Sequence, residues 1–104
     1  MRVLIAALCL CLAPMAWAGD PFITLASTTS THNSGLYDYL LPQFTADTGI
    51  TVHVISVGTG QAIKIAQNGD ADALLVHHRP SEDAFVADGY GIERRDVMYN
   101  DFIL

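Results

Sequence analysis

The sequence predicts an α/β domain with a mainly parallel sheet flanked by helices. Three apolar runs, residues 22–26, 50–57 and 73–76, have the length and composition of strands. Segments with helical features separate them, and no repeat, low-complexity tract or long linker intervenes. Because strands that alternate with helices join through right-handed crossovers, these strands are expected to run parallel.

The first strand is expected to stop at Ala26, where five consecutive hydroxyl residues begin. A helix follows, with apolar side chains at intervals of four residues: Leu36, Leu40 and Phe44. Ser34 is the predicted N-cap of this helix, and Gly49 ends it. Pro42 lacks a backbone N–H, so it is expected to kink or divide the helix.

The second strand, residues 50–57, is dense in β-branched side chains and ends in Gly58-Thr59-Gly60. The next segment, residues 61–68, carries alanine and isoleucine at spacings that suit a short helix. Gly69 follows at the position where a glycine commonly ends a helix. The strand, the glycine-flanked turn and the helix together form a second strand-to-helix unit.

The third strand, residues 73–76, is apolar throughout and is expected to be buried on both faces. The following helix is predicted to begin at Ser81, with acidic residues in its first turn, and to end at Gly89. Residues 97–104 are typical of the beginning of a fourth strand. Since the chain ends within this apolar run, we expect a truncated protein or a fragment.

Residues 1–18 have the three parts of a secretory signal peptide. A basic start at Arg2 precedes an apolar run, and Ala16-Trp17-Ala18 matches the small-x-small cleavage pattern. The apolar run is shorter than the roughly 20 residues that span a bilayer as a helix. We therefore predict cleavage before Gly19 and a periplasmic destination.

Both cysteines, Cys9 and Cys11, lie in the predicted signal peptide, so disulfides and thiolate chemistry are excluded from the mature chain. Once Arg2 is also removed, four basic and eleven acidic side chains remain, a formal charge of minus seven. This charge argues against nucleic acid as a partner, because its phosphates would be repelled. A small anion stays possible, since backbone dipoles act locally.

Polar loops follow all three predicted strands, and in open α/β sheets ligands bind at that edge. Thr28, Thr29 and Ser30 stand beside a helix start, where hydroxyl and backbone N–H donors could bind an anion. Thr59 lies between two glycines that allow close approach of a ligand to the backbone. The alternative is that these residues only cap helices and complete turns.

Other functions have weaker support. His77 and His78 are adjacent, and no third residue has metal-ligand spacing, so no metal site is predicted. Nothing indicates a cofactor. A hydrolase would have to use Ser30 with His32 or His78, but the Gly-x-Ser-x-Gly pattern is missing, which argues against an enzyme.

Arg94 and Arg95 could bind an anion or a partner. Both are flanked by acidic residues, Glu93 and Asp96, so a solvated ion-pair cluster is the preferred interpretation.

The segments STTSTHNSGLYDYLLPQFTADTGI and VGTGQAIKIAQNGDADALLVHHRPSEDAFVADGYGIERRDVMYNDFIL resemble the N-terminal portion of tungstate-binding proteins of ABC transporters. These are type II periplasmic binding proteins, two-lobed α/β folds that close around a ligand. The resemblance implies that residues 19–104 form an incomplete first lobe and that the second lobe is absent. Such a chain would bind its ligand weakly or not at all by itself.

The resemblance also implies a ligand, partners and a site. The ligand would be tungstate or the similar oxyanion molybdate, and the partner an ABC permease in the membrane. The implied ligand contacts are five hydroxyl residues: Ser27, Thr28, Thr29, Ser30 and Thr59. Ser27 stands where the family usually has threonine. Two alternatives stay open: an exported oxyanion-sensing domain of a signalling receptor, and a sulfate- or phosphate-binding relative.

Overall fold

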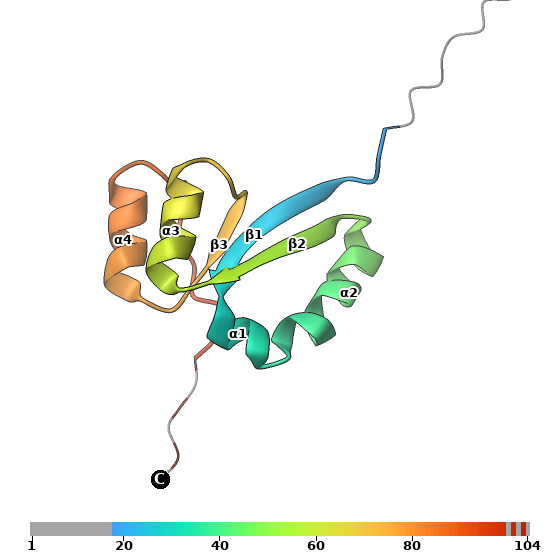
Figure 1. Cartoon of the computed structure of the whole chain (residues 1–104), viewed down its shortest axis with the longest axis horizontal. Helices are drawn as coiled ribbons and strands as arrows, with labels where there is room; N and C mark the ends of the chain where they lie inside the picture. Colours follow the sequence, from blue (N-terminus) through green and yellow to red (C-terminus); the bar gives the residue numbers. More distant parts are fainter. Residues whose placement is uncertain (1–17, 100, 102, 104) are drawn as a thin grey trace, which may run out of the picture.

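The computed structural model describes residues 18–99, 101 and 103 (Figure 1). The predicted signal peptide lies outside the described residues, apart from Ala18. Seven helices and strands follow one another along the described chain: β1 (Phe22–Thr28), α1 (Thr29–Asn33), α2 (Leu36–Thr48), β2 (Thr51–Val57), α3 (Thr59–Gln67), β3 (Ala73–Leu75) and α4 (Arg79–Ala87). The predicted α/β class is confirmed.

The three strands form one parallel sheet in the order β2-β1-β3, so the first strand of the chain lies in the centre. Figure 1 shows α1 and α2 on one side of this sheet and α3 and α4 on the other. Thr28 is opposite Val57, and Ser27 is opposite Leu75. Because all strands are parallel, their carboxyl ends meet at the same edge.

The core of the described domain is small and lies where helices cover β1. Four apolar side chains are buried there: Ala26, Tyr37, Ala62 and Ile63. Ala26 of β1 and Ala62 of α3 are completely buried, and their small side chains let the helix approach the central strand closely. Several large apolar side chains of α2 and the C-terminal segment are exposed instead, including Tyr39 and Tyr99.

The hydroxyl run is divided between a strand and a helix, which differs from the prediction. β1 continues to Thr28 and not only to Ala26, because Ser27 and Thr28 extend the ladder with β2. The five-residue helix α1 was not predicted, since it has no apolar stripe. It turns the chain between β1 and α2.

The predicted N-cap of α2 is wrong by one residue. Gly35 is the N-cap, with a φ of 82°, and Ser34 is the C-cap of α1. A left-handed residue is needed between two successive helices, and glycine adopts it without a steric penalty. Pro42 lies inside α2 and does not divide it. The carbonyl that loses its N–H partner belongs to the exposed residue Asp38, which water can reach.

The starts of α3 and α4, in contrast, lie earlier than predicted. α3 begins at Thr59, with Gly58 as N-cap, and not at residue 61. α4 begins at Arg79 and not at Ser81, because Pro80 is compatible with the first turn of a helix. α1, α3 and α4 therefore begin within one to four residues of a strand end, which brings their N-termini to the sheet edge.

The predicted fourth strand is not observed in the described part of residues 97–104. Residues 97–99, 101 and 103 have no strand assignment and pair with none of the three strands. Val97 and Tyr99 are largely exposed, so apolar composition without a neighbouring strand does not produce a ladder. No helix within residues 18–99 combines the length and apolarity that crossing a bilayer requires.

Gly91 gives a first prediction about packing, because the chain passes over α4 at this residue. A Cβ at Gly91 would lie 2.9 Å from Cε1 of Phe85 and 3.3 Å from Cγ2 of Val86. Gly91→Ala is therefore expected to lower the free energy of unfolding by about 1 kcal/mol through overpacking. A urea melt followed by circular dichroism measures the change.

Gly60→Ala in α3 is the matched control, since a Cβ there meets no atom within 4 Å. This variant is expected to be unchanged or more stable, because alanine favours a helix over glycine. Equal destabilisation by the two substitutions would contradict the packing argument.

Candidate functional site

The ends of the three strands bring together the hydroxyl run, Thr59 and His77 at one edge of the sheet. Thr28 is the last residue of β1, Thr59 the first residue of α3 after β2, and His77 follows β3. The predicted coincidence of three polar loops at this edge is confirmed by the parallel pairing. Such an edge is the usual ligand position in open α/β sheets.

The central group of the edge is the Thr28 hydroxyl. This side chain is only 2% exposed, and its Oγ1 lies 2.8 Å from Oγ1 of Thr31 and 3.3 Å from Oγ of Ser30. It also accepts the backbone N–H of Thr31 at 3.4 Å, as the N-cap of α1. Thr28 thus orders the first turn of α1 and holds the hydroxyls of Ser30 and Thr31 within hydrogen-bond distance of its own.

Ser30 connects this hydroxyl cluster to the third loop. Its Oγ lies 3.2 Å from Nε2 of His77, across 47 positions of sequence. Both side chains belong to exposed residues, in contrast to Thr28. The contact joins the loop after β1 to the loop after β3.

Ser27 has a different environment from the rest of the run, because it is completely buried. Its hydroxyl donates to the Leu75 carbonyl at 2.9 Å and shares a hydrogen bond with the Tyr37 hydroxyl. Since the Ser27 proton is directed at Leu75, the Tyr37 hydroxyl is the donor in the second bond. Burial raises the pKa of Tyr37, against the opposing effect of the Ser27 hydrogen bond, and so keeps the phenol protonated. Ser27 therefore joins β1, β3 and α2.

Thr29 and Thr59 occupy equivalent positions at the first residue of a helix. Thr29 opens α1 and is exposed, whereas Thr59 opens α3 and is half-buried. The first N–H groups of a helix have no partner within it, and the helix dipole places positive potential there. With the hydroxyls beside them, these positions present donors to the edge.

Two hollows of the described surface are not lined by the hydroxyl run. One, of about 700 Å³, lies between α2 and β2 and is lined by apolar side chains such as Leu41 and Val54 together with polar ones such as Asp38. Another, of about 580 Å³, lies between β3, α4 and the segment that follows α4. The hydroxyl cluster lines neither of them, so in this chain it forms an open donor-rich edge.

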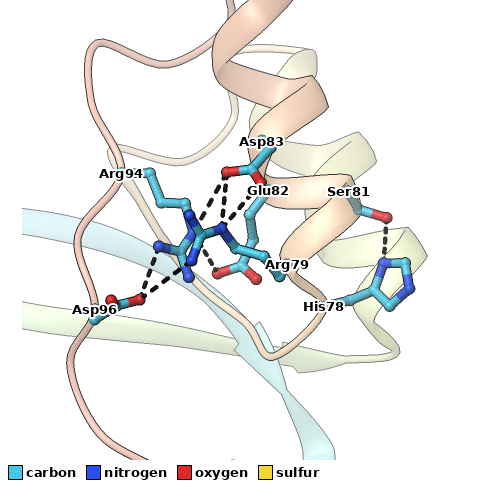
Figure 2. A network of polar contacts seen from close by, with 7 residues as sticks. All are labelled: His78, Arg79, Ser81, Glu82, Asp83, Arg94 and Asp96. Atoms are coloured by element: carbon cyan, nitrogen blue, oxygen red, sulfur yellow. Dashed lines mark hydrogen bonds and ion pairs between the residues drawn. The ribbon is translucent and has the colours of Figure 1, made fainter.

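The two adjacent histidines have separate partners. His77 contacts Ser30, while Nδ1 of His78 lies 2.6 Å from Oγ of Ser81 within the first turn of α4 (Figure 2). Within residues 18–99, 101 and 103, no three His, Cys, Asp or Glu side chains are grouped to hold a metal ion. His78 therefore belongs to the α4 start, and His77 belongs to the sheet edge.

The arginine pair is divided between two environments, which differs in part from the predicted solvated cluster. Arg95 is exposed and pairs with Glu93 at 2.9 Å, as expected. The Arg94 side chain is only 20% exposed and lies against α4, with its Nε 3.7 Å from Oε1 of Glu82 (Figure 2). The sequence could not indicate Glu82 as a partner of Arg94, because Glu82 lies in α4 and Arg94 lies in the segment that follows this helix.

Asp96 completes this pairing and makes it sensitive to pH. Arg94 donates to Asp96 at 2.8 Å, and this hydrogen bond lowers the pKa of Asp96 and raises that of Arg94. A depressed carboxyl pKa means that the pairing stabilises the fold above the ordinary Asp pKa. This stabilisation is lost as pH falls through the lower, folded-state value.

We therefore expect the Asp96 carboxyl to titrate below the range of a free aspartate, and Arg94→Met to move its midpoint back towards that range. Carbon-detected NMR titration of the side chain measures both midpoints. Arg95→Met is the control, since Arg95 pairs with Glu93. An unchanged Asp96 midpoint in Arg94→Met would contradict the assignment.

Comparison with known proteins places these features in a family. The sequence model of the PBP superfamily domain matches residues 16–104. A tungstate-binding protein, TupA, of Peptoclostridium acidaminophilum is 63% identical over 82 residues, which cover 79% of this chain and 29% of that protein. The chain thus spans less than a third of the length of this relative.

Solved structures agree in fold. The tungstate-binding protein TupA of Desulfovibrio alaskensis G20 superposes with a TM-score of 0.76 at 53% identity, covering 78% of this chain and 32% of that one. The structure described as the tungstate ABC transporter from Geobacter sulfurreducens gives a TM-score of 0.74 at 52% identity, covering 77% and 34%. With the family match over most of its length, this chain belongs to the PBP superfamily domain family.

Proposed function

We propose that this chain provides the first-lobe part of a periplasmic solute-binding protein that captures tungstate, or the similar oxyanion molybdate, for an ABC importer. The observation that carries the proposal is the hydroxyl cluster at the end of β1. It occurs in a chain that is 63% identical, over 82 residues, to a tungstate-binding protein. The cluster offers hydrogen-bond donors at the edge where ligands of α/β sheets bind.

The chemistry of the anion fits this donor set. Tungstate and molybdate are fully deprotonated at neutral pH and present only acceptor oxygens, so they require donors. Hydroxyl protons of Thr28, Thr29, Ser30 and Thr59, with backbone N–H groups at the start of α3, would supply them. Phosphate carries a proton at neutral pH and would also need an acceptor.

Ser27 is the fifth proposed contact and the least accessible one. Its hydroxyl already donates to the Leu75 carbonyl and accepts from Tyr37. An anion would have to displace Leu75 as the partner of the Ser27 proton. We therefore assign direct binding of the anion mainly to the other four residues. Ser27 instead holds in place the strand beneath them.

The remaining parts of the proposal concern the whole protein. Residues 1–18 would be a signal peptide cleaved before Gly19, and residues 19–104 would form part of the first lobe. A second lobe would close the cleft, and a membrane permease would receive the ligand. Ser30 and His77 are in contact at the donor edge, but among the described residues no carboxylate hydrogen-bonds to His77 as the orienting group of a catalytic triad would, so we propose binding without catalysis.

The proposal is tested by calorimetric titration of the full-length protein with tungstate, molybdate, sulfate and phosphate. Tungstate or molybdate is expected to bind most tightly, and phosphate least tightly because of its extra proton. Affinity should fall only modestly between low and physiological salt, since the contacts are local donors and not surface cations. Absence of heat with every tetrahedral oxyanion would refute the proposal.

A further inference from the structure

His77 is a part of the sheet edge to which the proposed function assigns no role. It follows β3, and its Nε2 lies 3.2 Å from Oγ of Ser30. In its neighbour His78, Nδ1 lies 2.6 Å from Oγ of Ser81 at the start of α4 (Figure 2). Of the two histidines, only His77 contacts the hydroxyl cluster.

Either His77 or Ser30 can be the donor in the hydrogen bond between them, and the two cases have opposite consequences for ligand binding. A neutral imidazole carries a proton on one ring nitrogen and a lone pair on the other. If Nε2 carried the lone pair, Ser30 would donate its only proton to His77. The lone pairs of Ser30 would then face the ligand, and they would repel an anion whose oxygens are all acceptors.

The opposite direction makes Ser30 a donor. If Nε2 carries the proton, it donates to Oγ of Ser30, and the Ser30 proton is free to point at the edge. Thr28 supports this arrangement, because its Oγ1 lies closer to Thr31 than to Ser30, at 2.8 Å against 3.3 Å. Thr28 therefore engages Thr31 and competes weakly for the Ser30 proton.

We propose that His77 is a positioning residue of the anion site, which holds its proton on Nε2 and thereby turns the Ser30 hydroxyl into a donor towards the ligand. The inference rests on the proposed function, because only an acceptor-only anion demands that direction. It adds to that function a group from the loop after β3, so that the loops after all three strands contribute. His77 acts through Ser30 and need not touch the ligand.

The tautomer is measured directly by two-bond ¹H–¹⁵N correlation of the histidine rings at about pH 8, above the pKa of a free histidine. We expect His77 to show a protonated Nε2 and an unprotonated Nδ1, with and without tungstate. Ser30→Ala is expected to weaken this preference. A proton on Nδ1 of His77 would overturn the inference whether or not an anion binds, so its failure is separate from that of the proposed function.

Binding measurements on three variants supply a second readout. His77→Leu removes the donor and is expected to reduce tungstate affinity about tenfold, whereas His77→Gln keeps an N–H donor and should restore most of it. His78→Leu is the matched control and should leave affinity unchanged, since His78 contacts Ser81. Wild-type affinity in His77→Leu, or an equal loss in His77→Leu and His78→Leu, would overturn the inference.

Discussion

Replacing Ser27 by alanine is expected to lower the free energy of unfolding by about 1–3 kcal/mol, because it leaves buried polar groups without partners. The Ser27 side chain is completely buried and joins the Leu75 carbonyl to the Tyr37 hydroxyl. Alanine fills most of the same space, so the loss reports the hydrogen bonds and little packing. Urea denaturation followed by tyrosine fluorescence measures it.

Ser56 provides a matched control on the neighbouring strand. It is opposite Ser27 in the β1–β2 ladder, and its hydroxyl oxygen is buried without a hydrogen-bond partner among the described residues. Ser56→Ala is therefore expected to be neutral or stabilising. Equal destabilisation by Ser27→Ala and Ser56→Ala would show that the hydrogen bonds of Ser27 contribute nothing specific.

Tyr37→Phe separates the two bonds of Ser27, because it removes the phenol oxygen and keeps the ring. A double-mutant cycle with Ser27→Ala is expected to give a coupling of at least about 0.5 kcal/mol, as groups in direct contact do. If the losses of stability in the two single variants simply add in the double variant, then of the two hydrogen bonds of Ser27 only the one to the Leu75 carbonyl stabilises the fold.

Replacing Thr28 by valine is expected to weaken tungstate binding by the full-length protein roughly 10- to 100-fold. Valine has nearly the shape of threonine, so the buried strand end is preserved. The lost hydroxyl contacts Ser30 and Thr31 and caps α1. Its removal takes away one proposed ligand donor and the group that orders two others.

Calorimetry of Thr28→Val with tungstate measures the effect, and Thr24→Val is its control. Thr24 lies on the same face of β1, four residues before Thr28, and therefore away from the carboxyl edge. Thr24→Val should keep wild-type affinity. Tungstate affinity within about twofold of wild type in Thr28→Val would remove Thr28 from the proposed site.

The strands were predictable from the sequence, because runs of β-branched and apolar residues favour ladders regardless of their neighbours. Their ends were less predictable. Ser27 and Thr28 are typical of a turn, yet they extend β1, since β2 continues beside them as far as Val57. The apolar residues 97–99 form no ladder, because a strand requires a partner that composition does not reveal.

The residue types at this edge of the sheet were predictable, and the contacts that each residue makes were not. Hydroxyls at the carboxyl end of a strand indicate an anion-binding edge, whichever of them points to the ligand. The separation of buried Ser27 from exposed Ser30 depends on Tyr37 and His77, which come from α2 and the loop after β3. Sequence patterns describe spacing within one segment, and these contacts join segments that are distant along the chain.

The central position of β1 has a consequence for how the molecule is made. A ribosome synthesises β1 before its two partners, and Ser27 meets Leu75 only after most of the domain has emerged. β2 is synthesised before β3 and covers one edge of β1, but the other edge stays free until β3 arrives. A free strand edge can pair with the wrong chain. The sheet is therefore completed only when β3 has been synthesised, and the two-stranded sheet is exposed to aggregation until then.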